Sequence, residues 1–323
     1  MRIITDSMPN PSFFEGTEKK LELVVTPDSP SLRALGDSVW REVVRAANAD
    51  VVSVARNEYC DAYVLSESSL FVFDDYCVMV TCGLTTLVDA FERLLHHVSI
   101  DSVAFLVYER KNEHFPERQP TTFYEDAERL QTMIPGRALR FGDEHGRHVQ
   151  MFHSTRPFAP ETTDPTLEVL MHGIDENVAR RFIGAEAQSE QSLARKVGLD
   201  SIVPGFATNE YVFEPAGYSL NALRDEEYYA VHVTPEEVGS YVSFETNHDF
   251  GGQLTEAVSR LIELFRPRAF DVVAFLPTGG PTLSVPGYRK GDHVCSNLGG
   301  YDVTYLQYYL ATTDPRGAYE IDL

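Results

Sequence analysis

Two stretches of this 323-residue chain repeat each other. LTTLVDAFERLLHHVSIDSVAFL starts at Leu84 and LTEAVSRLIELFRPRAFDVVAFL starts at Leu254, and they align without a gap, at a shift of 170 residues, with nine identities in 23 columns. Each has the pattern of an amphipathic helix followed by a strand. The repeat predicts a duplicated fold in one domain, with halves at about residues 1–160 and 161–323.

Strand patterns outnumber helical patterns and mostly follow one another directly, which favours antiparallel pairing. The first half offers KLELVVTP, VVSVAR, AYVLSE, SLFVFD and YCVMVTC, and a helix in SLRALGDSVWREVVRAANA, for which Ser31 is the expected cap. The second half offers LEVLM, a helix in DENVARRFI, and then EYVFEP, GYSLNAL, YYAVHVT and SYVSFE. Two sheets packed face to face, with helices outside, would cover every apolar face, so we expect an α+β fold.

The charge excludes some kinds of partner. Lys and Arg total 27 against 49 Asp and Glu, a balance of −22, which disfavours binding to nucleic acid and to anionic membranes. No apolar run is long enough for a membrane span, and MRIITDSMPNPSFF does not resemble a signal peptide. The four cysteines and the histidine pairs show no metal-binding spacing, so we expect no metal, reduced thiols and a cytoplasmic protein: Cys60, Cys77, Cys82, Cys295, His96, His97, His145 and His148.

The stretch YVLSESSLFV, from Tyr63 to Val72, has strand-forming residues around a polar centre. The simplest interpretation is the tip of a hairpin. The other is chemical, because a serine hydroxyl held against its own preceding carbonyl can turn the peptide into an ester. Elimination of that ester would cut the chain and leave a dehydroalanine, which hydrolyses to a pyruvoyl group. A tight bend between strands can hold the strain that such a step requires.

Five blocks resemble S-adenosylmethionine decarboxylase of the eukaryotic type: FFEGTEK, YVLSESSLFV, TCGLTT, GYSLNAL and HVTPE with SYVSFETN. The resemblance runs from Phe13 to about Tyr309. It implies a four-layer αββα sandwich of two antiparallel sheets that arose by internal duplication. It also implies self-cleavage between Glu67 and Ser68, into a β chain of residues 1–67 and an α chain of residues 68–323. Ser68 would become a covalent pyruvoyl cofactor, which forms a Schiff base with the substrate and accepts electrons as CO2 leaves.

The resemblance also assigns roles to single residues. Cys82 would reprotonate the substrate carbon, as a thiol can do near neutral pH, although a free cysteine is often only a small buried apolar residue. Ser219 would support the ester step and His232 would remove the Cα proton, whereas the alternative for His232 is a core histidine. The remaining expected site residues are Phe14 and Phe213 around the adenine, Glu236 on the ribose, Glu15, Glu18 and Glu67 in the site, and Leu65 and Ser69 near the pyruvoyl group.

A second acidic group matches the site that binds putrescine in stimulated members of the family: Glu22, Asp164, Thr166, Glu168 and Glu245. Asp164, Thr166 and Glu168 alternate, so one face of a strand would carry them. Lys20 stands where stimulated members have an apolar residue, and Val80 replaces a lysine. We expect Lys20, together with Arg110, to supply the positive charge, so that putrescine stimulates the protein little.

The function implied is pyruvoyl-dependent decarboxylation of S-adenosylmethionine for spermidine and spermine synthesis, by a monomer or a homodimer of αβ units. One alternative is a pyruvoyl enzyme for another cationic amino acid, ornithine or arginine, but Phe14, Phe213 and Glu236 would then have no adenosine to bind. Another is an inactive paralogue that activates a partner, which the intact processing residues disfavour. Ala216, where many members have Cys, is a minor departure near the pocket.

Overall fold

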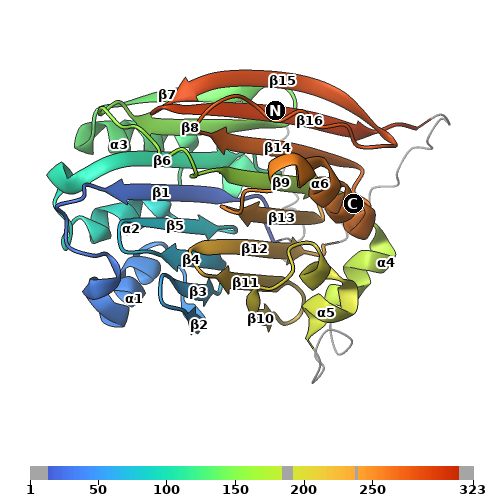
Figure 1. The fold of residues 1–323 in the computed structure, drawn as a ribbon, viewed down its shortest axis with the longest axis horizontal. Coiled ribbons are helices and arrows are strands. Elements are labelled where there is room, and N and C mark those ends of the chain that lie inside the picture. The colour runs from blue at the N-terminus through green and yellow to red at the C-terminus, as the bar shows by residue number, and fades with distance from the viewer. Residues whose placement is uncertain (1–13, 184–191, 237–238, 313–323) are drawn as a thin grey trace, which may run out of the picture.

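A computed structural model describes residues 14–183, 192–236 and 239–312 (Figure 1). Its strands form two eight-stranded sheets, and every strand pair in them is antiparallel. The first sheet has the order β2 (Val51–Arg56), β3 (Asp61–Leu65), β4 (Ser68–Val72), β5 (Tyr76–Thr81), β1 (Lys19–Val25), β6 (Val103–Lys111), β8 (His148–Ser154) and β7 (Gly136–Gly142).

The second sheet repeats this order, with each strand number raised by eight. Its strands are β10 (Ala207–Val212), β11 (Tyr218–Arg224), β12 (Glu227–Thr234), β13 (Tyr241–Thr246), β9 (Thr166–His172), β14 (Ala269–Leu276), β16 (Tyr301–Leu310) and β15 (Tyr288–Leu298). The sequence repeat falls on equivalent elements, since α2 (Leu87–Leu94) leads into β6 and α6 (Leu254–Phe265) leads into β14. The predicted fold class is therefore confirmed.

The helices cover the outer faces of the sheets (Figure 1). The first sheet packs against α1 (Gly36–Ala46), α2 (Leu87–Leu94) and α3 (Phe123–Met133), and the second against α4 (Glu176–Ala179), α5 (Leu193–Val197) and α6 (Leu254–Phe265). Short 3-10 turns occupy Arg33–Leu35, Ile100–Ser102, Pro116–Arg118, Arg180–Phe182, Leu199–Ser201 and Gly251–Gln253. None of the helices in the described residues combines the length and the apolar character needed to cross a membrane.

The layer between the sheets is apolar at its ends and polar in the middle. One end holds a cluster that includes Phe105 and Tyr305, and the other holds a cluster that includes Phe71 and Tyr228. Between them lie buried charged side chains such as Lys20 and those of several glutamates. Because buried charges are costly without partners, this middle part of the layer is a natural place to look for function.

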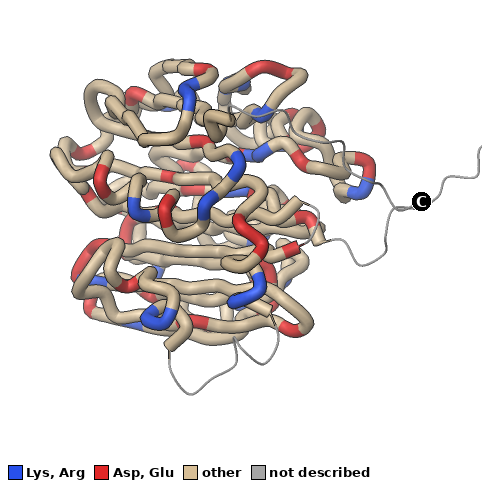
Figure 2. The backbone as a smooth tube through the Cα atoms, turned by 90° about the vertical axis from the view of Figure 1, so that its right-hand side faces the viewer, with Lys and Arg blue, Asp and Glu red and all other residues tan. Residues whose placement is uncertain are grey.

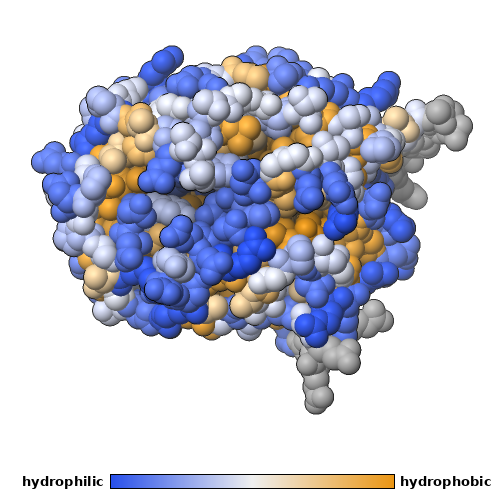
Figure 3. Space-filling model, in the orientation of Figure 1, coloured by the Kyte–Doolittle hydropathy of each residue, from blue (hydrophilic) through white to orange (hydrophobic). Residues whose placement is uncertain are grey.

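The outer surface is mainly polar. Figure 2 shows acidic residues on loops and strands alike, rather than in one patch, and Figure 3 shows apolar areas interrupted by polar ones. The net charge is thus spread over the molecule, which is what solubility alone would require.

Two local details differ from the sequence patterns. Ser31 does not cap α1, because a 3-10 turn precedes that helix and Ser31 Oγ accepts the N–H of Ala34 at 3.2 Å instead. The patterns named above also omit β7, β8, β15 and β16. Of these, β7 and β15 are edge strands that expose many of their side chains, so the apolar alternation that marks a strand is weak in them.

Candidate active site

The tight bend between β3 and β4 holds Ser68 in a strained conformation. Leu65 and Ser68 face each other across the hairpin, and Ser66 fixes the turn by exchanging hydrogen bonds with the backbone of Asp50 at 2.8 and 2.9 Å. The φ angle of Ser68 is 132°, a value that L-residues rarely adopt. The other described non-glycine residues with positive φ, Asn48, Asp225 and Arg266, lie at 46–61°, in the ordinary left-handed region. Strain is thus concentrated at one serine.

Cys82 contacts both residues of this bend. Its backbone N–H donates to the Glu67 carbonyl oxygen at 2.9 Å, and its Sγ lies 3.4 Å from the same oxygen and 3.3 Å from Ser68 Oγ. Burial, reinforced by the nearby Glu67 carboxylate, raises the pKa of the Cys82 thiol well above its usual range. The thiol is therefore neutral and holds a proton next to the Glu67–Ser68 bond.

The Glu67 carboxyl group has an unusual environment. Burial raises its pKa to about 7, and the positive charge of Lys19 offsets only part of this effect. Among the described residues, no group donates a hydrogen bond to Glu67 Oε2. A buried acceptor without a partner is rare, and here it lies at the wall of a cavity.

That cavity has a volume of about 350 Å³. It is lined by Phe14, Glu15, Glu67, Gly83, Leu84, Phe115, Arg118 and Gln119. A side chain at Gly83 would close it, because a Cβ atom there would lie 2.8 Å from Glu67 Oε2 and 3.1 Å from the Phe14 ring. Phe115, Arg118 and Gln119 come from the segment between β6 and α3, which the sequence patterns did not connect with the site.

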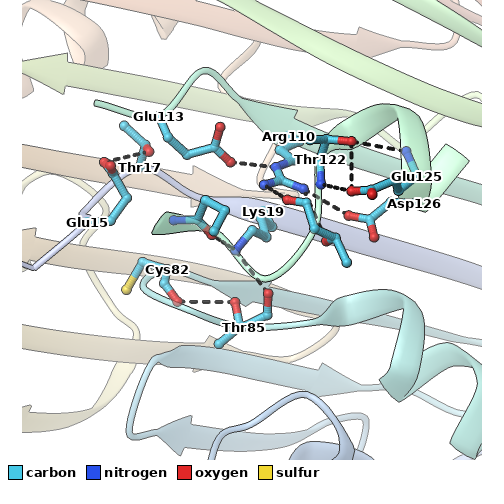
Figure 4. A network of polar contacts seen from close by, with 12 residues as sticks. Glu15, Thr17, Lys19, Cys82, Thr85, Arg110, Glu113, Thr122, Glu125 and Asp126 are labelled. Carbon is cyan, nitrogen blue, oxygen red and sulfur yellow. Dashed lines mark hydrogen bonds and ion pairs between the residues drawn. The ribbon is translucent and has the colours of Figure 1, made fainter. Parts of the chain in front are cut away.

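Glu15, which Figure 4 shows hydrogen-bonded to Thr17, also ties this segment to the cavity. Its Oε2 accepts the N–H groups of His114 and Phe115 at 2.9 and 3.1 Å, and its Oε1 lies 3.0 Å from His114 Nδ1. Burial raises the pKa of Glu15, but the hydrogen bonds from His114 and Phe115 outweigh it and hold the pKa below its usual value. The carboxylate is therefore ionised and already engaged with protein donors.

His232 lies in a second group of polar residues, on the inter-sheet side of β4. Its Nδ1 is 2.7 Å from Glu18 Oε1, and its Nε2 is 2.8 Å from Ser69 Oγ. Ser243 Oγ donates to the same Glu18 oxygen at 2.6 Å, and Ser219 stands directly opposite His232 in the β11–β12 pair. The arrangement is that of a base oriented by a carboxylate.

This places His232 against Ser69 rather than Ser68. Neighbouring residues of a strand point to opposite faces, so Ser68 faces the same way as Leu65, while Ser69 faces the second sheet. Of the residues expected from the sequence, the structure thus brings Glu67, Ser68 and Cys82 together on one side. It brings Glu18, Ser69, Ser219 and His232 together on the other.

Several expected site residues do not line the cavity, among them Ser68, Cys82, Leu65, Phe213 and Glu236. Leu65 is fully buried in the core between the first sheet and its helices. Phe213 packs edge-on against Tyr211, with 4.8 Å between the ring centroids. Glu236 has a backbone hydrogen bond with Phe14, and burial raises its pKa. It is therefore close to one of the two expected aromatic residues.

The acidic group between the sheets surrounds two lysines. Lys20 Nζ lies 2.9 Å from Glu168 Oε1, 3.4 Å from Glu245 Oε2 and 3.7 Å from Glu22 Oε2. Burial raises the pKa of Glu22 to about 7. Lys111 Nζ lies 2.7 Å from Glu168 Oε2 and also contacts Glu109. Two cations thus serve at least four carboxyl groups.

The prediction that Arg110 is the second cation of this group is wrong. Arg110 lies on the opposite face of β6, where it donates to Asp126 and contacts Glu113. Lys111 takes its place because residues 109 and 111 share the inter-sheet face. Asp164 accepts a hydrogen bond from the Tyr301 hydroxyl, and Thr166 is buried at the start of β9.

Lys111, Glu109 and Ser243 were missed at the sequence level, although a signal existed. Glu109, Arg110 and Lys111 are consecutive charges at the end of a strand that is otherwise strongly apolar, which indicates buried charges there but not which of them face the second sheet. In the part of the chain that the structure describes, no three His, Cys, Asp or Glu residues are arranged to hold a metal ion.

Comparisons with known proteins agree with this geometry. The family described as adenosylmethionine decarboxylase matches residues 11–309. S-adenosylmethionine decarboxylase proenzyme of Leishmania donovani is 35% identical over 297 residues, covering 86% of this chain and 77% of that protein. The proenzyme of Drosophila melanogaster is 31% identical over 332 residues, covering 92% and 95%. A crystal structure of Trypanosoma brucei AdoMetDC-delta26 monomer has the same fold, with a TM-score of 0.61 and 24% identity over 75% of this chain and 99% of that one.

Proposed function

Because the chain belongs to the adenosylmethionine decarboxylase family, we propose that it removes CO2 from S-adenosylmethionine. The product, decarboxylated S-adenosylmethionine, would donate aminopropyl groups for spermidine and spermine synthesis. The observation that carries the proposal is the strained Ser68 at the bend, with Cys82 in contact with both the Glu67 carbonyl and the Ser68 hydroxyl. With four free thiols, we propose a cytosolic enzyme.

Self-cleavage would begin when Ser68 Oγ attacks the carbonyl carbon of Glu67. The C–N bond breaks, the nitrogen takes the hydroxyl proton, and an ester joins the two residues. The strain at Ser68 favours this step, since breaking the peptide relieves it. The Cys82 N–H, at 2.9 Å from the carbonyl oxygen, would stabilise the negative charge that develops there.

The second step would use His232 as a base. Glu18 holds Nδ1, which leaves Nε2 free to accept a proton from Ser68 Cα once His232 has left Ser69. The Cβ–O bond then breaks, Glu67 leaves as a free carboxylate, and residue 68 becomes a dehydroalanine. Addition of water and loss of ammonia would convert that residue to a pyruvoyl group at the new N-terminus.

The pyruvoyl group would supply a carbonyl that bonds to the substrate amine and withdraws electrons as CO2 leaves. Residues at this position fit such a group, because Ser68 is its precursor and Cys82 Sγ lies 3.3 Å from Ser68 Oγ, beside the Glu67 carbonyl that Cys82 N–H binds. Cys82, kept neutral by burial, would return a proton to the substrate carbon. Phe14 would stack on the adenine, together with Phe213, and Glu236 would bind the ribose hydroxyls.

We also propose that putrescine has little effect on this enzyme. Lys20 and Lys111 already bring two positive charges to the buried carboxyl groups that a diamine would neutralise. Activity of the purified protein should change less than about twofold when millimolar putrescine is added, a difference of under about 0.4 kcal/mol. A several-fold rise would contradict this part of the proposal.

The test starts with the intact mass of the purified protein beside a Ser68→Ala variant. Two fragments that end and begin at the Glu67–Ser68 bond, the larger with a pyruvoyl mass, would support self-cleavage. Release of labelled CO2 from S-adenosylmethionine, compared with ornithine and arginine, would then identify the substrate. A wild-type chain that stays intact and releases no CO2 would overturn the proposal in favour of an activating subunit.

A further inference from the structure

Two buried polar atoms without partners belong to residues that line the same cavity. They are the Oε2 atom of Glu67 and the Nε2 atom of Gln119, for which the described residues offer no hydrogen bond. One is an acceptor and the other is a donor. Because buried polar groups are almost always satisfied, such a complementary pair in one cavity points to a ligand with both a donor and an acceptor.

Lys19 determines which way the Gln119 amide faces. Its ammonium donates to Gln119 Oε1 at 2.7 Å and to the backbone oxygens of Gly83 and Thr85 at 3.2 and 2.9 Å. An ammonium has only donors, so the amide oxygen must face Lys19 and the NH2 group must point away from it. Figure 4 shows Lys19 next to the turn that carries Cys82 and Thr85. The amide is therefore oriented before any substrate arrives.

These contacts place Gln119 at the end of the cavity that lies beside the turn carrying Cys82 and Gly83. Gly83 directly follows Cys82, and its carbonyl shares Lys19 Nζ with the Gln119 side chain. The substrate groups that must reach this end are the α-amine, which donates, and the α-carboxylate, which accepts. Glu67 can accept from the first, and Gln119 can donate to the second.

We propose that Gln119 is a substrate-positioning residue that holds the α-carboxylate through Nε2–H, with its amide oriented by Lys19. The inference rests on the proposed decarboxylation and deepens it. A neutral donor suits the reaction, because the carboxylate loses its charge as CO2 leaves and a paired cation would stabilise the starting state instead. Arg118, the cation that also lines the cavity, lies over the Phe115 ring at 4.8 Å.

The test compares ligands with and without the carboxylate in a Gln119→Leu variant. The decarboxylated product lacks the group that Gln119 is proposed to bind. Its dissociation constant, measured by calorimetry, should therefore stay within about twofold of the wild type. The KM for S-adenosylmethionine should rise about tenfold, as expected for a lost hydrogen bond to a charged group, while kcat changes much less.

Two further variants sharpen the comparison. Gln119→Glu would present an acceptor where a donor is needed, so its KM should rise further than that of Gln119→Leu. Gln131→Leu, at an exposed position on α3, is the matched control and should leave KM unchanged. Self-cleavage, followed on a denaturing gel, should proceed in every variant and shows that the fold is intact.

Three results would overturn the inference. Equal weakening of substrate and product would mean that Gln119 serves the adenosyl part or the fold. No change in KM would mean that it does not contact the substrate. A carboxylate-selective loss in Arg118→Leu, but not in Gln119→Leu, would assign the role to the arginine. Failure of the proposed function itself would be seen separately, as a wild-type protein that releases no CO2.

Discussion

Cys82 is positioned for both proposed reactions, because its backbone N–H contacts the Glu67 carbonyl while its thiol faces Ser68. In a Cys82→Ala variant the backbone N–H remains, so self-cleavage should continue, although more slowly. The decarboxylation rate should fall by about 10²–10⁴-fold, the usual contribution of a positioned acid. Fragment formation on gels and CO2 release measure the two effects separately. Equal loss of both would show that the thiol acts only through the fold.

Gly83 keeps the cavity open between Glu67 and Phe14. A Gly83→Ala variant should lose affinity for the substrate, because its Cβ would meet both side chains, and should lose about 1 kcal/mol of stability at φ +65°. Gly36→Ala is the matched control, since Gly36 has φ +79° but nothing within 4 Å of the added Cβ. It should show a similar loss in thermal unfolding with an unchanged KM. An unchanged KM in Gly83→Ala would contradict the assignment of the cavity.

Sequence and structure agree at this scale on the bend at Glu67–Ser68, which depends on neighbours along the chain. They diverge where it depends on how strands face one another. Arg110 and Lys111 are adjacent cations in the sequence, and only the pairing of β6 with β1 decides that Lys111 meets the carboxylates. The contact of His232 with Ser69 likewise depends on the packing of two sheets, which the local pattern does not contain.

At the scale of elements, β1 supplies Lys20, the cation that several buried carboxyl groups share. Lys20→Met would leave Glu245 without a cation and Glu168 with Lys111 alone, and should destabilise the fold by about 3–5 kcal/mol, the usual cost of breaking a buried pair. Urea unfolding measures this loss. Lys290→Met, on the exposed face of β15, should have almost no effect. Added putrescine, a dication, should stabilise the Lys20 variant more than the wild type, and an equal effect on both would contradict this view.

Glu22, on the same strand, should make the stability of the fold depend on pH. Its pKa in the folded chain is about 7, above the ordinary value of 4.5 for a glutamate, because it is buried. The folded state therefore binds more protons than the unfolded state between these pH values, and stability should fall as pH rises through this window, by about 2 kcal/mol. A Glu22→Gln variant should show a smaller fall between pH 5 and pH 8 in urea unfolding. Glu263→Gln, exposed on α6, should retain the full slope.

The buried strands β3, β4 and β5 were predictable from their apolar runs, and α6 from its helical spacing. The edge strands β7 and β15 were not, because many of their side chains are exposed, whereas the edge strands β2 and β10 were found from their sequences. The role of the segment from β6 to α3 in the site could not be predicted for a different reason. Its role comes from contacts with Glu15 and Lys19, about a hundred positions away along the chain.

For the whole molecule, the order of the strands determines whether the two fragments could separate after cleavage. A cut after Glu67 would put β1, β2 and β3 in the shorter fragment, yet β1 pairs with β5 on one side and β6 on the other. The fragments should therefore stay together in size-exclusion chromatography and separate only in denaturant. Elution of a free fragment of residues 1–67 under native conditions would contradict the proposed cut or this strand order.

The central position of β1 also determines how the protein could refold before and after the cut. Before the cut, β1 finds its place between β5 and β6 as part of one chain, so the search is intramolecular. After the cut, a denatured enzyme would have to bring two separate chains together, and its refolding would become second order in protein concentration. The active form would then persist because it unfolds slowly, not because it can be reassembled easily. The cell could make such an enzyme only from the intact precursor, and an unfolded molecule would be lost for good.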